Sequence, residues 1–223
     1  MTDAGQPLTI DVVSDVVCPW CYLGAKRLAA AVAEEGGRVV VRWRPFQLDP
    51  AIPEGGLDRT QYMKRKFGRG WKMKAVHKNL VKLGAQVGLP FAFDKISRAP
   101  NTLDAHRLIR WAASGDAQDA VVDRLFRAYF VEGRDVGDRG VLVDIAAQTG
   151  LDAPFVASML DEGADVEAVR SQIAQAQAAG VKSVPFFIIA GRLGVQGAQD
   201  VPVLRRAIGQ VRAAMKAAAV ESI

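Results

Sequence analysis

The chain has 223 residues, of which 50% are hydrophobic and 24% charged, a composition typical of globular proteins rather than disordered or fibrous ones. Its two cysteines are too few for a disulfide framework, and no apolar run approaches the roughly 18 residues that a membrane span needs. The opening residues, MTDAGQPLTIDVV, carry an acidic residue where a secretory signal carries positive charge. We therefore expect a cytoplasmic protein that keeps its thiols reduced and has no membrane segment.

Positive charge is concentrated in residues 58–82. The chain has a net charge of +5, yet this segment alone holds nine basic residues and one acidic residue, so the remainder sums to −3. The ordinary explanation is a solvated helix face, and the alternatives are attraction of glutathione, of an acidic small molecule or of an acidic protein surface. Because the segment matches no nucleic-acid-binding module and has few interleaved aromatic residues, we expect no nucleic-acid partner.

The N-terminal part predicts a β-α-β unit. Residues 8–14 (LTIDVVS) alternate and then become apolar, as a strand does, and residues 22–35 favour a helix that Gly36 and Gly37 end. Residues 38–46 are rich in β-forming side chains. The connection is long enough for a right-handed crossover between parallel strands, which puts Cys18 at a junction of strand and helix.

The rest of the chain predicts a helical block followed by a β-β-α ending. Apolar residues recur at helical spacing through residues 58–180, whereas residues 184–189 (VPFFII) form an apolar run too short to favour a helix. The predicted fold class is α/β, with one discontinuous domain made of residues 1–57 and 181–223. Residues 58–180 would form a helical insertion domain.

The pair Cys18 and Cys21 admits three interpretations: half a zinc site, two structural thiols, or a redox dithiol. A zinc site needs two more cysteine or histidine ligands, and His77 and His106 are isolated, so we predict no metal. Cys18 would lie at a helix N-terminus, where free N–H groups and the helix dipole favour a thiolate. Cys21 would lie one turn further, within reach of a mixed disulfide, and Pro19 fits the first helical turn.

The segment SVPFF supplies a second candidate feature. Val184 must be extended because it precedes Pro185, and a proline that opens a buried strand is a candidate for a cis peptide bond. Its simpler role is to mark the strand entry. Together with a dithiol at a strand–helix junction, we favour the cis form, which would leave the neighbouring backbone open to pair with substrate.

Four blocks in this order carry a resemblance to a known family: SDVVCPWCYLGAKRL, NTLDAHRLIRWA, LFRAYFVEGRD and SVPFFII…GVQGAQ. They resemble the DsbA-like thioredoxin family, in its FrnE branch of cytoplasmic dithiol-disulfide oxidoreductases. The similarity runs from about residue 8 to residue 210. It implies a thioredoxin-like fold with a helical domain inserted between its β-α-β and β-β-α halves.

The resemblance also implies roles for single residues: Cys18 as the attacking thiolate, Cys21 as the resolving cysteine and Pro185 as the cis-proline. The related 2-hydroxychromene-2-carboxylate isomerases and kappa-class glutathione transferases have a serine at the first of these positions and use it to activate glutathione. The cysteine at position 18 favours dithiol chemistry. Some FrnE-type proteins have a further C-terminal cysteine pair, which this chain lacks.

Four more residues are candidates for substrate binding. Trp20 lies between the cysteines, and Val184 precedes the candidate cis-proline. Asn101 would cap a helix, and His106 would be either a buried hydrogen-bonded histidine or a group that lines the substrate cleft.

The first functional hypothesis is a thiol-disulfide oxidoreductase or isomerase that acts on a disulfide-containing protein or small molecule. A cellular thiol or oxidant would restore its dithiol. We expect no permanently bound cofactor, with glutathione as a redox partner or co-substrate; a homodimer is compatible with the sequence. The alternatives are a glutathione-dependent isomerase or transferase of a small aromatic or polyketide substrate, and a binding protein without turnover.

Overall fold

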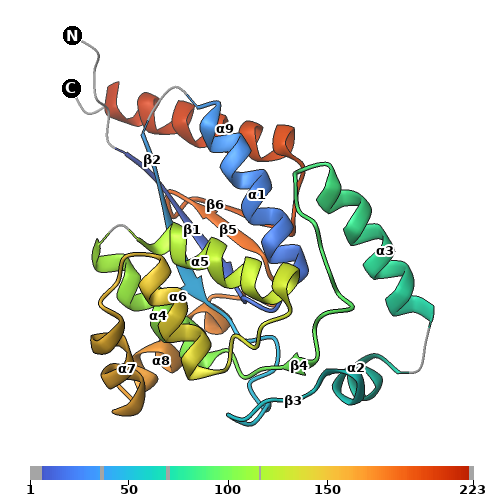
Figure 1. The fold of residues 1–223 in the computed structure, drawn as a ribbon. Coiled ribbons are helices and arrows are strands. Elements are labelled where there is room, and N and C mark those ends of the chain that lie inside the picture. The colour runs from blue at the N-terminus through green and yellow to red at the C-terminus, as the bar shows by residue number, and fades with distance from the viewer. Residues whose placement is uncertain (1–6, 36–37, 69–70, 116, 221–223) are drawn as a thin grey trace.

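A four-stranded sheet lies at the centre of the fold (Figure 1). The computed structural model describes residues 7–35, 38–68, 71–115 and 117–220. The strands, in their order across the sheet, are β2 (Val39–Pro45), β1 (Leu8–Ser14), β5 (Phe186–Ile189) and β6 (Leu193–Gln196). β1 and β2 are parallel and joined by α1 (Pro19–Ala33), whereas β5 is antiparallel to β1, and β6 to β5. This is the predicted β-α-β and β-β-α arrangement, closed by α9 (Val201–Val220).

One face of the sheet packs against α1 and α9. Side chains alternate along β1, so that Leu8, Ile10 and Val12 share one face and are buried. They form one apolar cluster with residues of both helices, including Leu28 of α1 and Ile208 of α9. The packing fixes α1 against the sheet and thereby fixes the position of its first residues, where the dithiol lies.

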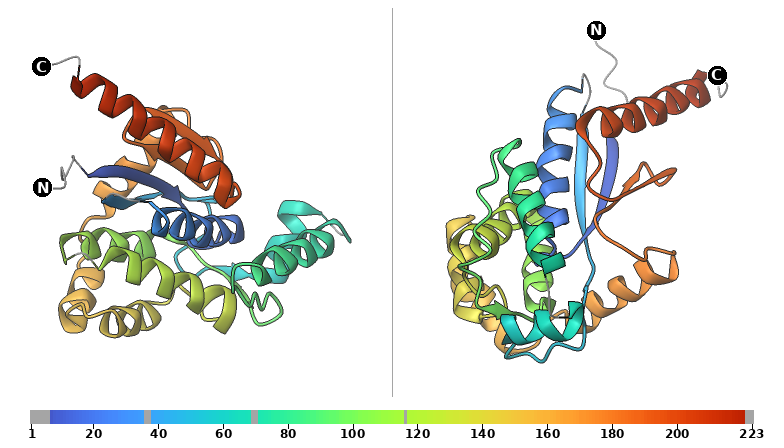
Figure 2. Two further views of the ribbon diagram at one scale, coloured as in Figure 1. Left: turned by 90° about the horizontal axis from the view of Figure 1, so that it is seen from above. Right: turned by 90° about the vertical axis from the view of Figure 1, so that its right-hand side faces the viewer.

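Between β2 and β5 the chain is mainly helical, as predicted. The helices of this part are α2 (Arg59–Phe67), α3 (Trp71–Ala85), α4 (Leu103–Ala112), α5 (Gln118–Arg127), α6 (Arg139–Gln148), α7 (Ala153–Asp161) and α8 (Val166–Ala178). Figure 2 shows that α4 to α7 gather in one group, that α8 extends away from it, and that α2 and α3, which carry the basic stretch, project separately.

The apolar core is continuous between the sheet and these helices. Val13 of β1 belongs to the same buried cluster as Leu125 of α5. Tyr22, which follows Cys21, stacks on Phe126 of α5 with ring centroids 4.9 Å apart. The N-terminal turn of α1 is therefore held by the helical part as well as by the sheet. The division into domains of residues 1–57 with 181–223 and 58–180 stays a prediction.

Three local features differ from the sequence-based expectation. A short antiparallel pair of β3 (Leu57–Asp58) and β4 (Arg98–Ala99) joins the ends of the α2–α3 segment. α5 continues into a π-helical turn (Ala128–Glu132), ended by Gly133 at φ 74°. α4 begins at Leu103, so Thr102 occupies the N-cap position that we expected for Asn101.

Candidate functional site

The dithiol lies where β1 ends and α1 begins, as the sequence predicts. Cys18 is the N-cap residue of α1 and has an extended backbone (φ −91°, ψ 113°), and Pro19 takes the first helical turn. The Cys18 N–H donates to the carbonyl of Asp15 at 3.0 Å, which closes a tight turn after the strand. The Cys18 carbonyl accepts the N–H of Cys21 at 3.0 Å. The Cys18 side chain thus stands at the positive end of the helix dipole.

The two thiols are free and differ in their surroundings. Cys18 is 4% exposed and Cys21 only 1%. Burial raises the pKa of the Cys21 thiol well above 9, and the adjacent Cys18 raises that pKa further. The Ser14 hydroxyl and the Asp15 backbone act on the same pKa in the opposite direction, but burial dominates. Cys21 therefore keeps its proton at neutral pH.

A cis peptide bond between Val184 and Pro185 lies beside the dithiol. The Cys18 thiol is 3.8 Å from the Val184 carbonyl, as a donor to that oxygen. Residues 166 positions apart in the chain therefore share one site. The geometry of the peptide bond is the one that the sequence favours, and the residues Cys18, Cys21, Val184 and Pro185 lie together.

The turn between β6 and α9 is hydrogen-bonded to Pro185. The Gly197 N–H donates to the Pro185 carbonyl at 2.8 Å. Arg27 of α1 is 8% exposed; it donates to the Ala198 carbonyl at 2.6 Å and forms an ion pair with Asp200 at 2.8 Å. These contacts connect α1, two turns beyond the dithiol, to the segment that holds the cis-proline.

Gly24 allows α1 to approach this segment closely. A Cβ added at Gly24 would lie 2.9 Å from Cγ of Pro185 and 3.2 Å from the Phe187 ring. We did not predict roles for Gly24 and Arg27 from the sequence. Their spacing in the sequence could have indicated these roles. Gly24 follows Cys21 by three residues and precedes Arg27 by three and Leu28 by four, so these side chains share one face of the helix.

A buried polar layer lies beneath the Cys18 turn. The Asp15 carboxylate is 1% exposed; its Oδ2 accepts the Leu48 N–H at 2.8 Å, and its Oδ1 is 3.6 Å from Nε2 of His106. His106 Nε2 also lies 2.9 Å from the Phe46 carbonyl, and since a carbonyl only accepts, this nitrogen carries the proton. His106 is thus a buried, hydrogen-bonded histidine that is connected to the dithiol through Asp15.

Asn101 is half-buried beside Gln47, and none of its hydrogen bonds in the described part of the chain goes to either cysteine. Its Oδ1 accepts hydrogen bonds from the Gln47 side chain and the Leu103 N–H, and its Nδ2 donates to the Ile52 carbonyl at 2.6 Å. Asn101 therefore fixes the segment after β2 against the start of α4. Trp20, between the cysteines, is half-buried and packs on the main core cluster.

Within the described residues, no group of three or more histidine, cysteine, aspartate or glutamate side chains could hold a metal ion. The helices of that same part of the chain include none that is long and apolar enough to span a membrane.

A sheet of this topology with a dithiol at the first strand–helix junction and a cis-proline opposite defines a thioredoxin-fold protein. The chain belongs to the DSBA-like thioredoxin domain family, which it matches over residues 9–209. The family that the sequence motifs resemble is therefore confirmed, together with the α/β fold class.

Individual proteins agree with this assignment. An uncharacterised protein of Bacillus subtilis, YwbO, is 30% identical over 200 residues, which cover 89% of this chain and 94% of YwbO. The crystal structure of a probable DsbA oxidoreductase from Streptomyces coelicolor is 32% identical, with a TM-score of 0.84 over 91% of this chain and 89% of that one.

Two more distant structures share the fold. A 2-hydroxychromene-2-carboxylate isomerase has a TM-score of 0.68 at 19% identity, covering 91% of this chain and 95% of its own. The cytosolic disulfide reductase DsbM of Pseudomonas aeruginosa has a TM-score of 0.61 at 23% identity, covering 94% and 97%.

Proposed function

We propose that this protein is a thiol-disulfide oxidoreductase whose reaction centre is the dithiol of Cys18 and Cys21. The observation that carries the proposal is the placement of Cys18 at the start of α1 with its sulfur 3.8 Å from the carbonyl before a cis-proline. Cys18 thus lies at the N-terminus of α1 beside the cis-proline, and a second thiol lies one turn away in the same helix.

In the proposed reaction, the Cys18 thiolate attacks one sulfur of a substrate disulfide. A bond forms between Cys18 and that sulfur, and the other substrate sulfur leaves as a thiolate that takes up a proton. Cys21 then loses its proton and attacks the Cys18 sulfur, which releases the second substrate thiolate. The substrate gains two electrons and two protons, and the protein holds a Cys18–Cys21 disulfide. A cellular thiol such as glutathione returns the pair to the dithiol by two exchanges. When the substrate's own thiol attacks the mixed disulfide first, the result is isomerisation.

The different surroundings of the two thiols support this division of roles. The raised pKa of the Cys21 thiol keeps it from competing for the first attack. Val184 would pair through its backbone with an extended substrate, and Trp20 would contact the substrate beside the dithiol. His106 would support the site through Asp15, and Asn101 would do so by fixing the segment after β2.

The cellular setting belongs to the proposal as well. A cytoplasmic, FrnE-like enzyme with glutathione as its redox partner agrees with the likeness to cytosolic DsbM, one structure of which is described with GSH. The partners would then be a disulfide-containing protein or small molecule and a cellular thiol or oxidant. The homodimer stays a proposal, and a gel-filtration measurement tests it.

The likeness to 2-hydroxychromene-2-carboxylate isomerase supports a second candidate function. This is a glutathione-dependent isomerase or transferase that acts on a small aromatic molecule. That chemistry needs one residue to activate glutathione and no resolving thiol. Cys21→Ser distinguishes the two, because it stops turnover by a dithiol and leaves a glutathione-activating site intact. A binding protein without turnover would catalyse neither disulfide exchange nor a glutathione-dependent reaction.

The direct test is reduction of insulin by the protein with glutathione or dithiothreitol as the reductant. We expect the wild type to accelerate insulin precipitation, and Cys18→Ser to abolish the acceleration. Isomerisation of scrambled ribonuclease, which the mixed disulfide alone can support, should survive in part in Cys21→Ser. Insulin reduction that persists in Cys18→Ser would refute the proposal.

A further inference from the structure

The basic stretch within residues 58–82 forms an exposed surface on α2 and α3. α2 has no buried residue, whereas α3 packs on the fold through Leu80, which belongs to the same buried cluster as Tyr22 of α1. Figure 2 shows that both helices project from the rest of the fold. We define the α2–α3 surface by its exposed basic residues Lys64, Arg65, Lys74, Lys78 and Lys82 and its exposed apolar residues Phe67 and Val81.

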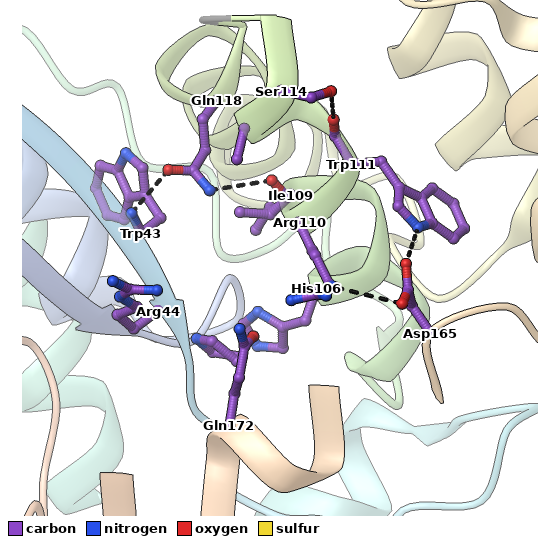
Figure 3. Close-up of a pocket in the computed structure, with 12 residues that line it drawn as sticks. Trp43, Arg44, His106, Ile109, Arg110, Trp111, Ser114, Gln118, Asp165 and Gln172 are labelled. Carbon is purple, nitrogen blue, oxygen red and sulfur yellow. Dashed lines mark hydrogen bonds and ion pairs between the residues drawn. The ribbon is translucent and has the colours of Figure 1, made fainter. Parts of the chain in front are cut away.

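The positive charge of this surface is not balanced within the part of the chain that the structure describes. None of its basic residues has an ion-pair partner there, and Asp58, the one acidic residue of the stretch, accepts a backbone N–H at the start of α2. Elsewhere arginines lie against carboxylates. Figure 3 shows one such pair at a cavity of about 490 Å³ beside β2, where Arg110 lies 3.4 Å from Asp165. The α2–α3 surface therefore keeps its charge available for an acidic partner.

The lysines of α3 stand in a row. Lys74, Lys78 and Lys82 recur every four residues, which puts them on one side of the helix, and Val81 lies next to the last of them. At a rise of about 1.5 Å per residue the row is about 12 Å long, the length of about four residues of an extended chain. A single carboxylate cannot pair with all three lysines, so the row favours a polypeptide with several acidic side chains.

α2 is connected to the turn that carries the dithiol. Nζ of Lys66 donates to the Leu48 carbonyl at 3.2 Å and pairs with Asp49 at 3.6 Å. The N–H of Leu48 donates in turn to Asp15, three residues before Cys18. The Leu48 side chain is itself 41% exposed and extends the apolar part of the surface toward the dithiol. A polypeptide held on the α2–α3 surface is therefore close to the site at which its disulfide would react.

We propose that the α2–α3 surface docks the acidic flanks of a disulfide-containing polypeptide substrate. The lysine row of α3 and the basic residues of α2 pair with aspartate and glutamate side chains, and Phe67 and Val81 contact apolar side chains between them. This inference rests on the proposed thiol-disulfide function and adds a substrate class to it. Because exposed charges act mainly on association, the surface should lower KM rather than raise kcat.

The test compares two synthetic peptides that share one small disulfide loop, which is flanked by glutamates in the first peptide and by lysines in the second. Dithiothreitol serves as the reductant because it is uncharged as a dithiol, so salt acts on the peptide step. At about 0.01 M salt, where charges act over about 30 Å, kcat/KM should be about tenfold higher for the acidic peptide. At about 1 M salt this range falls to about 3 Å, and the difference should fall below about threefold.

Reversal of the lysine row tests the surface itself. The triple variant Lys74→Glu, Lys78→Glu and Lys82→Glu should lower kcat/KM for the acidic peptide by about tenfold at low salt, with the change in KM. Its turnover of bis(2-hydroxyethyl) disulfide, a small uncharged substrate, should equal that of the wild type. Circular dichroism checks that the variant folds, and the comparison of the two peptides on the wild type needs no variant.

The matched control makes the same change of charge away from the dithiol. It converts three exposed basic residues to glutamate: Arg38, Arg192 and Lys216. Arg38 and Arg192 lie at the end of the sheet where β1 begins, whereas Cys18 follows the other end of that strand, and Lys216 lies in the last turns of α9. The control should keep the preference of the wild type for the acidic peptide.

The outcomes separate this inference from the function on which it rests. Equal kcat/KM for the two peptides, or a preference that the lysine variant retains, would overturn the docking surface, while turnover of the uncharged disulfide would leave the thiol-disulfide function standing. No turnover of any of the three disulfides would refute both. Equal turnover of the peptides together with binding to vesicles of anionic phospholipid would assign the surface to a membrane and so overturn the proposal.

Discussion

The close contact between α1 and the cis-proline segment predicts opposite effects for the same substitution at two glycines. In the interior of a helix, alanine is favoured over glycine by about 1 kcal/mol. At Gly209 in α9 an added Cβ meets no atom within 4 Å, so Gly209→Ala should raise the free energy of unfolding by about 0.5–1 kcal/mol.

At Gly24 the added Cβ would lie 2.9 Å from Pro185 and 3.2 Å from Phe187. Ordinary contact begins near 3.4 Å, so Pro185 or α1 must move by about 0.5 Å. Overpacking of a core typically costs about 1–3 kcal/mol, which offsets the helix propensity and leaves Gly24→Ala between neutral and about 2 kcal/mol less stable. The two variants should therefore differ by about 0.5–3 kcal/mol in the free energy of unfolding.

Urea denaturation followed by circular dichroism measures this difference, and at this chain length each kcal/mol corresponds to about 2–4 °C in Tm. Because the residue that must move is Pro185, Gly24→Ala should also slow insulin reduction, whereas Gly209→Ala should not. If Gly24→Ala stabilised the protein as much as Gly209→Ala and left turnover unchanged, the described contact between α1 and the proline would be wrong.

Three further variants or conditions test other parts of the site. Arg27→Met leaves the Ala198 carbonyl and Asp200 without their partner, so the free energy of unfolding measured in urea should fall by about 1–3 kcal/mol. Arg205→Gln, which breaks the exposed ion pair with Glu34, should lower it by less than about 1 kcal/mol. Equal losses in the two variants would contradict the support that we assign to Arg27. His106→Leu leaves the buried Phe46 carbonyl unpaired and should also cost about 1–3 kcal/mol, a loss that His106→Gln, which can still donate, should partly restore. The folded reduced protein holds the Cys21 proton more tightly than the unfolded chain, so the stability that this proton contributes is complete below pH 9 and is lost as the pH rises further. Cys21→Ala should therefore lose less stability than the wild type above pH 9, as urea denaturation at a series of pH values would measure. Identical pH profiles in the two proteins would argue against the raised pKa of Cys21.

The sequence was sufficient to predict the elements that periodicity and local chemistry determine. The alternation of β1, the glycines after α1 and the short apolar run of β5 predicted the strands and their order in the chain. Cys18 was expected at the start of a helix because Pro19 favours the first turn and a strand precedes it, and α1 begins at Pro19.

The supports of the site could not be predicted, because they depend on distances between segments that the fold brings together. In the sequence Arg27 is an ordinary helical arginine, and only the fold brings the turn before α9 into contact with it. In the same way, the need for glycine at position 24 depends on where Pro185 lies. Asn101 illustrates the reverse case. Its residue type predicted an N-cap, yet its side chain is engaged by Gln47 and Ile52, and the helix begins two residues later.

The same limit applies to His106. The sequence left two roles open, a buried histidine or a group that lines a cleft. In the structure His106 is buried against Phe46 and Asp15, and it also borders the cavity beside β2. Both features arise from the packing of α4 against the end of β2, which no local pattern in the sequence encodes.

The central claim, that Cys18 attacks and Cys21 resolves, is tested most directly by trapping the first intermediate. Cys21→Ser, incubated with oxidised glutathione and analysed by intact-mass and peptide mass spectrometry, should accumulate one glutathione on Cys18, because no resolving thiol remains. Cys18→Ser should stay unmodified under the same conditions, since the remaining Cys21 is buried and protonated. Rapid glutathionylation of Cys21 in Cys18→Ser, or no adduct on Cys18 in Cys21→Ser, would contradict the account.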